Sequence, residues 1–140
     1  MRLIAHIGAQ KTATTYIQHG LYRNQDVLAD HGVYLPTTAR LELAPRSVGH
    51  HHLVWQYTDQ ERFRPDIGGW DSLRAELARV QPDVALITCE GMAAMAHKHG
   101  RGDDLMRELR ATEARRHVRV EIPFYTGQAH TVSELTTLWP

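Results

Sequence analysis

Residues 3–15 read LIAHIGAQKTATT, an apolar run followed by a polar loop that ends in two threonines. The run Leu3–Ile7 is broken by Gly8, which is typical of a buried strand that ends in a turn. Apolar residues then recur at helical spacing over residues 14–31, and Gly32 follows where a left-handed cap ends a helix. The stretch therefore predicts a strand, a loop and a helix in succession.

The rest of the chain repeats this alternation of strands and helices. An amphipathic pattern over residues 70–80 predicts a second helix, and the continuous apolar run Val84–Thr88 predicts a strand covered on both faces. Asp103 is a suitable N-cap for a third helix, and residues 118–122 alternate as a third strand. The order predicts a single α/β domain over residues 1–140, with a largely parallel sheet flanked by helices.

Residues 37–69 lack a clear period, because several prolines and glycines interrupt them. We expect mostly loop with some helical turns. Long loops inside compact domains are usually functional, so this region is expected to face a substrate.

The loop after the first strand has the features of a phosphate site. Backbone N–H groups converge at the start of a helix, where the helix dipole also favours an anion. Lys11 adds a positive charge, and three threonines add hydroxyl donors. A Walker A loop requires Gly directly before the Lys, and Gln10 stands there instead, so an ordinary ATP-binding loop is disfavoured.

The segment Ile7–Thr15 resembles the 5′-phosphosulfate loop of sulfotransferases, which has a Pro-Lys-Thr/Ser-Gly-Thr-Thr type of sequence. The resemblance extends through Gln18, Leu21, Asn24, Leu28 and residues 32–36, and it is closest to the bacterial branch of the family. It implies a three-layer P-loop-like fold. It also implies transfer of a sulfuryl group from 3′-phosphoadenosine-5′-phosphosulfate (PAPS) to a hydroxyl or amine of a small-molecule or carbohydrate acceptor.

The resemblance also implies roles for individual residues. Lys11 would stabilise the leaving phosphate, because a fixed ammonium stabilises developing negative charge. The donor's 5′-phosphosulfate would be held by the segment that comprises Gln10, Lys11, Thr12, Ala13, Thr14 and Thr15. This segment departs from the family pattern at Gln10, where Pro is usual, and at Ala13, where Gly is usual.

Sulfuryl transfer to a hydroxyl needs a base, and two candidates remain open. Glu90 follows a predicted parallel strand, where ligand sites of open α/β sheets collect, and residues 88–90 resemble a Ser-Ser-Glu-like element of bacterial members. One of the adjacent histidines 50–52, with His51 as the representative, is the alternative. Glu90 is equally consistent with a solvated loop carboxylate or a helix cap. The histidines are also consistent with a plain polar loop.

The resemblance weakens toward the end of the chain. Ser133 stands at a suitable spacing for the donor's 3′-phosphate, but Thr126-Gly127 occupies the place of the usual Arg. Members of the family usually continue well beyond the position that corresponds to Pro140, so we expect the C-terminal part of the family fold to be missing. We therefore keep a non-catalytic nucleotide- or anion-binding or assembly module as the second hypothesis, and we expect a homodimer that covers the shortened sheet.

Composition limits the remaining options. Sixteen basic and sixteen acidic residues balance, so no net field favours nucleic acid or a membrane surface. The single Cys89 excludes an internal disulfide and favours the cytoplasm, and the apolar run at the N-terminus is too short for a signal peptide. Three adjacent histidines cannot all bind one ion from an extended segment, so we expect no metal site.

Overall fold

The computed structural model describes residues 1–7, 14–43, 47–114, 120–123 and 129–131. The elements in these ranges are β1 (Arg2–His6), α1 (Thr14–Arg23), α2 (Gln25–Asp30), β2 (Val33–Tyr34), β3 (Leu41–Leu43), β4 (Ser47–Gly49), α3 (His52–Thr58), α4 (Trp70–Val80), β5 (Val84–Thr88), α5 (Gly91–His97), α6 (Gly102–Ala114), β6 (Val120–Pro123) and β7 (Ala129–Thr131).

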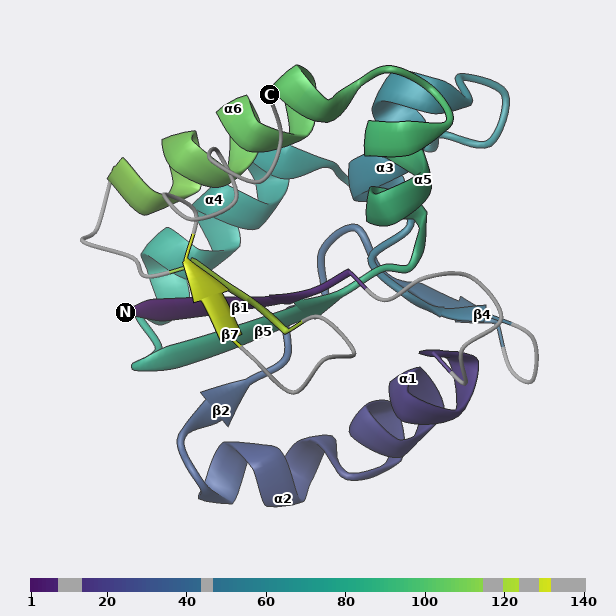
Figure 1. Cartoon of the computed structure of the whole chain (residues 1–140). Helices are drawn as coiled ribbons and strands as arrows, with labels where there is room; N and C mark the ends of the chain where they lie inside the picture. Colours follow the sequence, from purple (N-terminus) through teal and green to yellow (C-terminus); the bar gives the residue numbers. More distant parts are fainter. Residues whose placement is uncertain (8–13, 44–46, 115–119, 124–128, 132–140) are drawn as a thin grey trace.

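The main sheet has the strand order β2-β5-β1-β6-β7. Strand β1 pairs in parallel with β5 and with β6, β2 pairs in parallel with β5, and β7 is antiparallel to β6. Helices α1 and α2 lie on one side of this sheet and α3 to α6 on the other (Figure 1). The predicted α/β class, with a small and largely parallel sheet flanked by helices, is therefore confirmed.

Alternation along β1 and β5 sends one set of side chains into the core. Leu3 pairs with Ala85 and Ala5 with Ile87, and all four side chains are fully buried in the same cluster. Successive side chains of a strand point to opposite faces. His6 and its partner Thr88 consequently belong to the opposite face.

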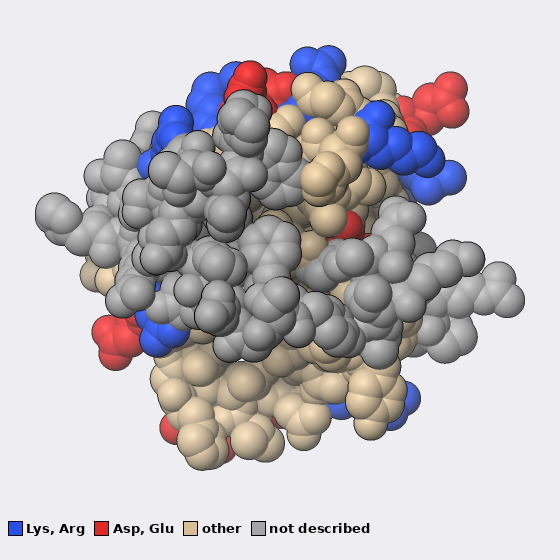
Figure 2. All heavy atoms as spheres, viewed as in Figure 1, with Lys and Arg blue, Asp and Glu red and all other residues tan. Residues whose placement is uncertain are grey.

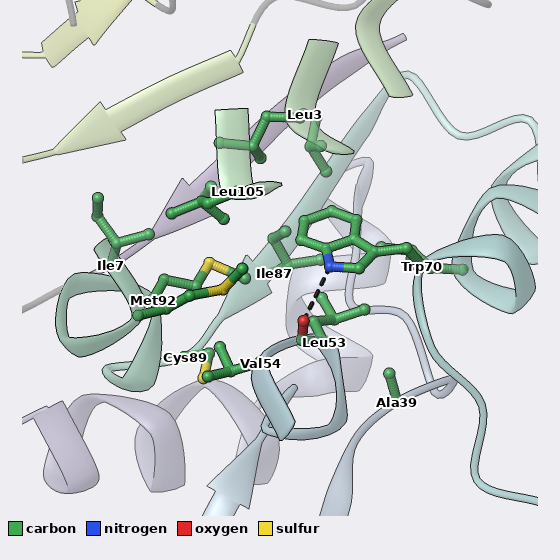
Figure 3. Close-up of a cluster of buried hydrophobic side chains, with 14 of the residues drawn as sticks. Leu3, Ile7, Ala39, Leu53, Val54, Trp70, Ile87, Cys89, Met92 and Leu105 are labelled. Atoms are coloured by element: carbon green, nitrogen blue, oxygen red, sulfur yellow. Dashed lines mark hydrogen bonds between the residues drawn. The ribbon is translucent and has the colours of Figure 1, made fainter. Parts of the chain in front are cut away.

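The core is closed by a tryptophan from α4. Trp70 is 1% exposed, and its indole N–H donates a hydrogen bond of 2.8 Å to the carbonyl oxygen of Leu53 in α3 (Figure 3). Met92 and Met95 of α5 and Leu105 of α6 pack in the same cluster. The buried indole is satisfied by a backbone carbonyl, which avoids the cost of an unpaired donor.

The helix predicted over residues 14–31 is divided into α1 and α2 at Asn24. The Asn24 side chain donates a 2.7 Å hydrogen bond to the carbonyl oxygen of Gly20, which also accepts the Asn24 backbone N–H. Local side-chain bonds of this kind compete with a regular helix. The predicted left-handed cap is found at Gly32, with φ of 75°.

Residues 37–69 contain more regular structure than predicted. Strands β3 and β4 form an antiparallel pair, and α3 follows directly. The three adjacent histidines are buried rather than presented on a loop. Their polar character gave no sign in the sequence that all three would be buried.

The later elements follow the sequence pattern closely. The predicted helix over residues 70–80 and the predicted strand Val84–Thr88 are α4 and β5. The third helix begins at Gly102, one residue before the expected N-cap, and the described part of the third strand begins at Val120. The short helix α5 was not predicted.

The buried carboxylate of Glu76 in α4 binds the segment from Tyr34 to Thr38 through hydrogen bonds. Glu76 accepts hydrogen bonds from the Tyr34 hydroxyl at 2.6 Å, from the Thr37 hydroxyl at 2.8 Å, and from the backbone N–H groups of Thr37 and Thr38. Burial raises the pKa of Glu76, but these hydrogen bonds outweigh it and lower the pKa to about 2. The carboxylate form is therefore strongly favoured in the folded protein.

The surface carries charges of both signs. Described Lys, Arg, Asp and Glu side chains are interspersed around the rim of the face in Figure 2, without one large patch of either sign among the described residues there. Within the described part of the chain, each helix is too short or too polar to cross a bilayer.

We predict that replacing Glu76 with Gln removes an acid-dependent part of the stability. The folded pKa of about 2 lies below the ordinary 4.5, so this contribution is complete above pH 4.5 and is lost as the pH falls toward 2. At pH 7 the free energy of unfolding should fall by about 1–3 kcal/mol, because the amide cannot accept all the hydrogen bonds. Urea unfolding followed by circular dichroism at several pH values measures this.

The control is Glu61→Gln, because Glu61 is exposed. Burial lowers the pKa of His50 to about 4, so acid below pH 6.5 also destabilises the fold through that ring in both variants. The charge of Glu76 opposes this shift, so the loss of stability through His50 should be somewhat larger in Glu76→Gln. If Glu76→Gln and Glu61→Gln lost stability in parallel between pH 4.5 and 2, the described role of Glu76 would be wrong.

Candidate functional site

Polar side chains gather where β1 and β5 end. His6 and Thr88 are register partners, and Nδ1 of His6 lies 2.8 Å from Oγ1 of Thr88. Both strands run in parallel, so their carboxyl ends meet at one edge of the sheet. Ligand sites of open α/β sheets form at this edge.

Glu90 lies two residues beyond β5 and immediately before α5. Its Oε2 accepts a hydrogen bond from the hydroxyl of Thr14, the first residue of α1. Thr14 is buried, whereas Glu90 is only partly buried. The carboxylate is thus held in place and still reaches solvent.

The charge of Glu90 acts on two histidines. Burial lowers the pKa of His6 and of His51, and the nearby Glu90 carboxylate raises both pKa values in opposition. Burial is the larger effect in each case. Both rings are therefore neutral at pH 7, with one nitrogen that can accept a proton.

His50 has a structural position. Its Nδ1 accepts the backbone N–H of Thr88 at 3.1 Å, and its Nε2 lies 3.1 Å from the carbonyl oxygen of Pro36, to which it must donate. The His50 backbone N–H also donates to the Thr88 carbonyl oxygen at 2.8 Å. Both ring nitrogens are thus used within the protein, so His50 is not available as a base.

His51 faces Cys89. The Sγ of Cys89 lies 3.7 Å from Nδ1 of His51, and burial raises the pKa of the thiol to about 12. The thiol therefore remains protonated, and the contact with Nδ1 can be made with either tautomer of the ring. Stacking on Trp55, with ring centroids 5.5 Å apart, fixes the ring plane.

His52 points to a third environment. Its Nδ1 accepts the backbone N–H of Arg64 at 3.2 Å, and its ring lies against Trp55 and Phe63. The three adjacent histidines therefore contact three different parts of the fold. In the described ranges, no group of three or more His, Cys, Asp or Glu side chains is arranged to hold a metal ion.

Gly49 lies where several of these groups approach most closely. A Cβ atom at this position would lie 3.0 Å from Nε2 of Gln18, 3.0 Å from the carbonyl oxygen of Thr88 and 3.1 Å from Nε2 of His51. Only a residue without a side chain permits this approach. The site therefore joins β4, β5, α1 and the residue that precedes α3.

The predicted site residues fall into two groups. Glu90 and His51, the two alternatives for a base, lie at the same edge of the sheet, and Thr14 contacts Glu90 directly. Thr15 is exposed. The residues Gln10, Lys11, Thr12, Ala13 and Ser133 lie outside the described ranges.

Sequence reasoning missed three members of the site. His6 was treated only as part of a strand, although a histidine at the last position of a parallel strand is itself a signal. Gln18 was noted only as part of the family resemblance, and Gly49 only as an interruption. Gln18 and Gly49 come together only in the folded chain, so the local sequence around them gave no signal.

Comparison with known proteins gives limited information. No family model matches the sequence, and no solved structure matches it. Part of the chain is similar to the coproheme decarboxylase of Mycolicibacterium smegmatis, with 57% identity over 37 residues. The match covers 26% of this chain and 16% of the decarboxylase, so the chain spans only a small part of that protein's length.

This finding contradicts the predicted sulfuryl transfer, because the matched protein is a decarboxylase, which has a different function. The sulfotransferase function is therefore wrong. A physical reason accompanies it: the Thr14 hydroxyl, expected to hold a phosphate, is engaged by the Glu90 carboxylate, which would repel a second anion. The family resemblance, the PAPS donor, the cytoplasmic location and the homodimer are not tested and stay predictions.

We predict opposite effects for two Gly→Ala substitutions. Gly49→Ala should lower the free energy of unfolding by about 1–3 kcal/mol, because the new methyl group meets a backbone oxygen and two side chains. Gly20→Ala, in the middle of α1 with no neighbour within 4 Å, should raise it by about 0.4–1 kcal/mol. Urea unfolding measures both, and an unchanged Gly49→Ala would contradict the described approach.

Proposed function

We propose that this chain is an enzyme that performs acid–base chemistry on a small polar molecule at the carboxyl ends of β1 and β5, with Glu90 as the group that moves the proton. The observation that carries the proposal is the placement of Glu90. Its carboxylate is fixed by the Thr14 hydroxyl, is partly open to solvent, and acts electrostatically on His6 and His51.

The environment of Glu90 suits proton transfer. A general base must be held within hydrogen-bond reach of the proton that it takes, and here the carboxylate is oriented through Oε2, which leaves Oε1 for a substrate or a water. The two neutral histidines can share a proton that Glu90 has accepted. The reaction class that follows is addition of water, or another proton-bearing nucleophile, to a polarised carbon.

Hydrolysis of 4-nitrophenyl acetate is a suitable probe reaction. Glu90 would take a proton from water as the water oxygen bonds to the ester carbon, and 4-nitrophenolate would leave as the tetrahedral adduct collapses. Glu90→Gln, which keeps the shape but cannot act as a base, should lower the rate above background by roughly 10–100-fold. The release of 4-nitrophenolate is followed by its absorbance.

The exposed Glu61→Gln variant is the matched control and should retain the wild-type rate. Thr14→Ala should cause a smaller loss than Glu90→Gln, because it frees the carboxylate without removing it. Equal rates for Glu90→Gln and Glu61→Gln would refute the proposal.

A second candidate function is the binding of coproheme. It is favoured by the 57% identity over 37 residues to coproheme decarboxylase. Since that match covers only 16% of the decarboxylase, binding is proposed here without the decarboxylation.

Titration with coproheme and with iron-free coproporphyrin tests the second candidate. We expect a saturable shift of the Soret absorption with coproheme and a saturable change in fluorescence with the iron-free compound, because a site for the tetrapyrrole does not require the iron. Binding of coproheme alone would indicate ligation of iron by one of the ten histidines. That outcome would still support binding of coproheme, with the iron as part of what is recognised, whereas no binding of either compound would refute the candidate.

A further inference from the structure

The connection between α3 and α4 is fixed to the rest of the fold at both of its ends. At one end, the backbone N–H of Asp59 donates to the carbonyl oxygen of Trp55 at 2.9 Å. At the other end, the carbonyl oxygen of Ile67 accepts the backbone N–H of Ala39, also at 2.9 Å. We call residues 59–67 the strap, and most of its side chains are exposed.

His52 of α3 holds the middle of the strap. This residue is 0% exposed, and its Nδ1 accepts the backbone N–H of Arg64 at 3.2 Å. The ring of Phe63 lies against the same imidazole, with ring centroids 5.9 Å apart. A backbone N–H can only donate, so Nδ1 carries no hydrogen, and the hydrogen of the neutral ring is on Nε2. The contact therefore requires the neutral form of His52 in one tautomer.

A charged His52 ring could not be satisfied in this arrangement. Nε2 has no hydrogen-bond partner among the described residues, and a proton on Nδ1 would face the N–H of Arg64. A buried charge without hydrogen-bond partners is strongly disfavoured. Water can accept hydrogen bonds from both ring nitrogens only if the strap moves away from the ring.

We infer that the strap is a pH-sensitive switch: a proton that binds Nδ1 of His52 breaks the hydrogen bond to Arg64 and releases residues 61–66 from α3. The two ends of the strap stay in place, because their hydrogen bonds join backbone groups that do not titrate. The opening is therefore local. The inference is independent of the acid–base function proposed above.

The charged groups around His52 set the direction of the switch. Burial is the largest effect and lowers the pKa of His52, Arg64 of the strap lowers it further, and Asp66 of the strap raises it. His51, the neighbour on α3, is kept neutral by its own burial, and a charge on His52 lowers its pKa further. The folded pKa of His52 thus lies below the ordinary 6.5, so the closed strap is fully stable above pH 6.5 and loses stability as the pH falls.

Trp55 connects the strap to the candidate site. Its ring stacks on His51, and the ring of His52 lies against it at a steep angle. The guanidinium carbon of Arg62, in the strap, lies 5.8 Å from the centroid of the Trp55 ring. Opening of the strap removes this contact, so the ring of His51 is held most firmly while the strap is closed.

Hydrogen exchange of the Arg64 amide, followed by NMR, tests the switch. We expect its protection factor, which corrects for the intrinsic effect of pH on exchange, to fall roughly tenfold between pH 7 and pH 5, because protons bind the open form more tightly. Long-range ¹H–¹⁵N spectra should show a hydrogen on Nε2 of His52 alone at pH 7, and on both nitrogens where protection is lost. The amide of Ile87, inside the sheet, should stay protected.

Two substitutions of His52 separate the hydrogen bond from the titration. His52→Asn offers an oxygen near the place of Nδ1 and does not titrate, so its Arg64 amide should have the same protection factor at pH 7 and pH 5. His52→Phe keeps a ring but has no acceptor, so protection should be lost at both pH values. His99→Asn is the matched control, because His99 is exposed, and it should follow the wild type.

Three results with the wild type alone would overturn the switch, so a variant that does not fold leaves the inference testable. They are an Arg64 amide with equal protection factors at pH 7 and pH 5, a hydrogen on Nδ1 of His52 at pH 7, and a joint loss of protection at Arg64 and Ile87, which would indicate global unfolding. A loss of protection in His52→Asn that parallels the wild type would also overturn it, because another group would then be responsible.

Discussion

The site depends on how His50 is joined to Thr88. Strand β2 is only two residues long and pairs with Val84 and Ala85, so among the described residues no strand lies beside the end of β5 on that edge. His50 takes the place of a strand partner: its ring accepts the Thr88 N–H and its backbone donates to the Thr88 carbonyl. Because buried backbone groups must be paired, this contact fixes the chain on both sides of His50.

The contact between His50 and Thr88 also fixes the positions of Gly49 and His51, the two neighbours of His50 in the chain. Gly49 ends β4 beside the Thr88 carbonyl, and the His51 ring lies between Gly49 and the thiol of Cys89. Glu90 follows on the same strand end, with Thr14 of α1 as its anchor. Four elements that are distant in sequence are thereby brought to one edge, where the partly exposed Glu90 carboxylate lies near the neutral rings of His6 and His51.

Much of the fold could be predicted from local sequence. Strand β5 and helix α4 have patterns that only one kind of element produces, and Gly32 marks the end of α2 because its φ is positive. Helix α5 escaped prediction because its short run of Ala and Met has no clear polar face. The division at Asn24 also escaped, since an Asn inside a helical pattern gives no sign of which carbonyl its side chain will bind.

The site was harder to predict than the fold. Glu90 was identified correctly as a residue at a strand end, because that position follows from β5 alone. Gln18 and Gly49 were not identified, because their importance comes from the close approach of Gly49 in β4 to Gln18 in α1 and to Thr88 in β5. The loop at Ile7–Thr15 favoured a phosphate ligand, but the Glu90 carboxylate that reaches Thr14 comes from 76 positions later in the chain. Local sequence does not reveal such a contact.

The place of β1 in the sheet has a consequence for the order of folding. It lies between β5 and β6, and its last residue contacts a side chain 82 positions further along. Pairing of such distant segments requires closure of long loops, which slows folding. As the ribosome synthesises the chain, the first strand must remain unpaired until β5 has emerged, and its buried residues Leu3 and Ala5 stay uncovered until the later helices that pack on them have formed.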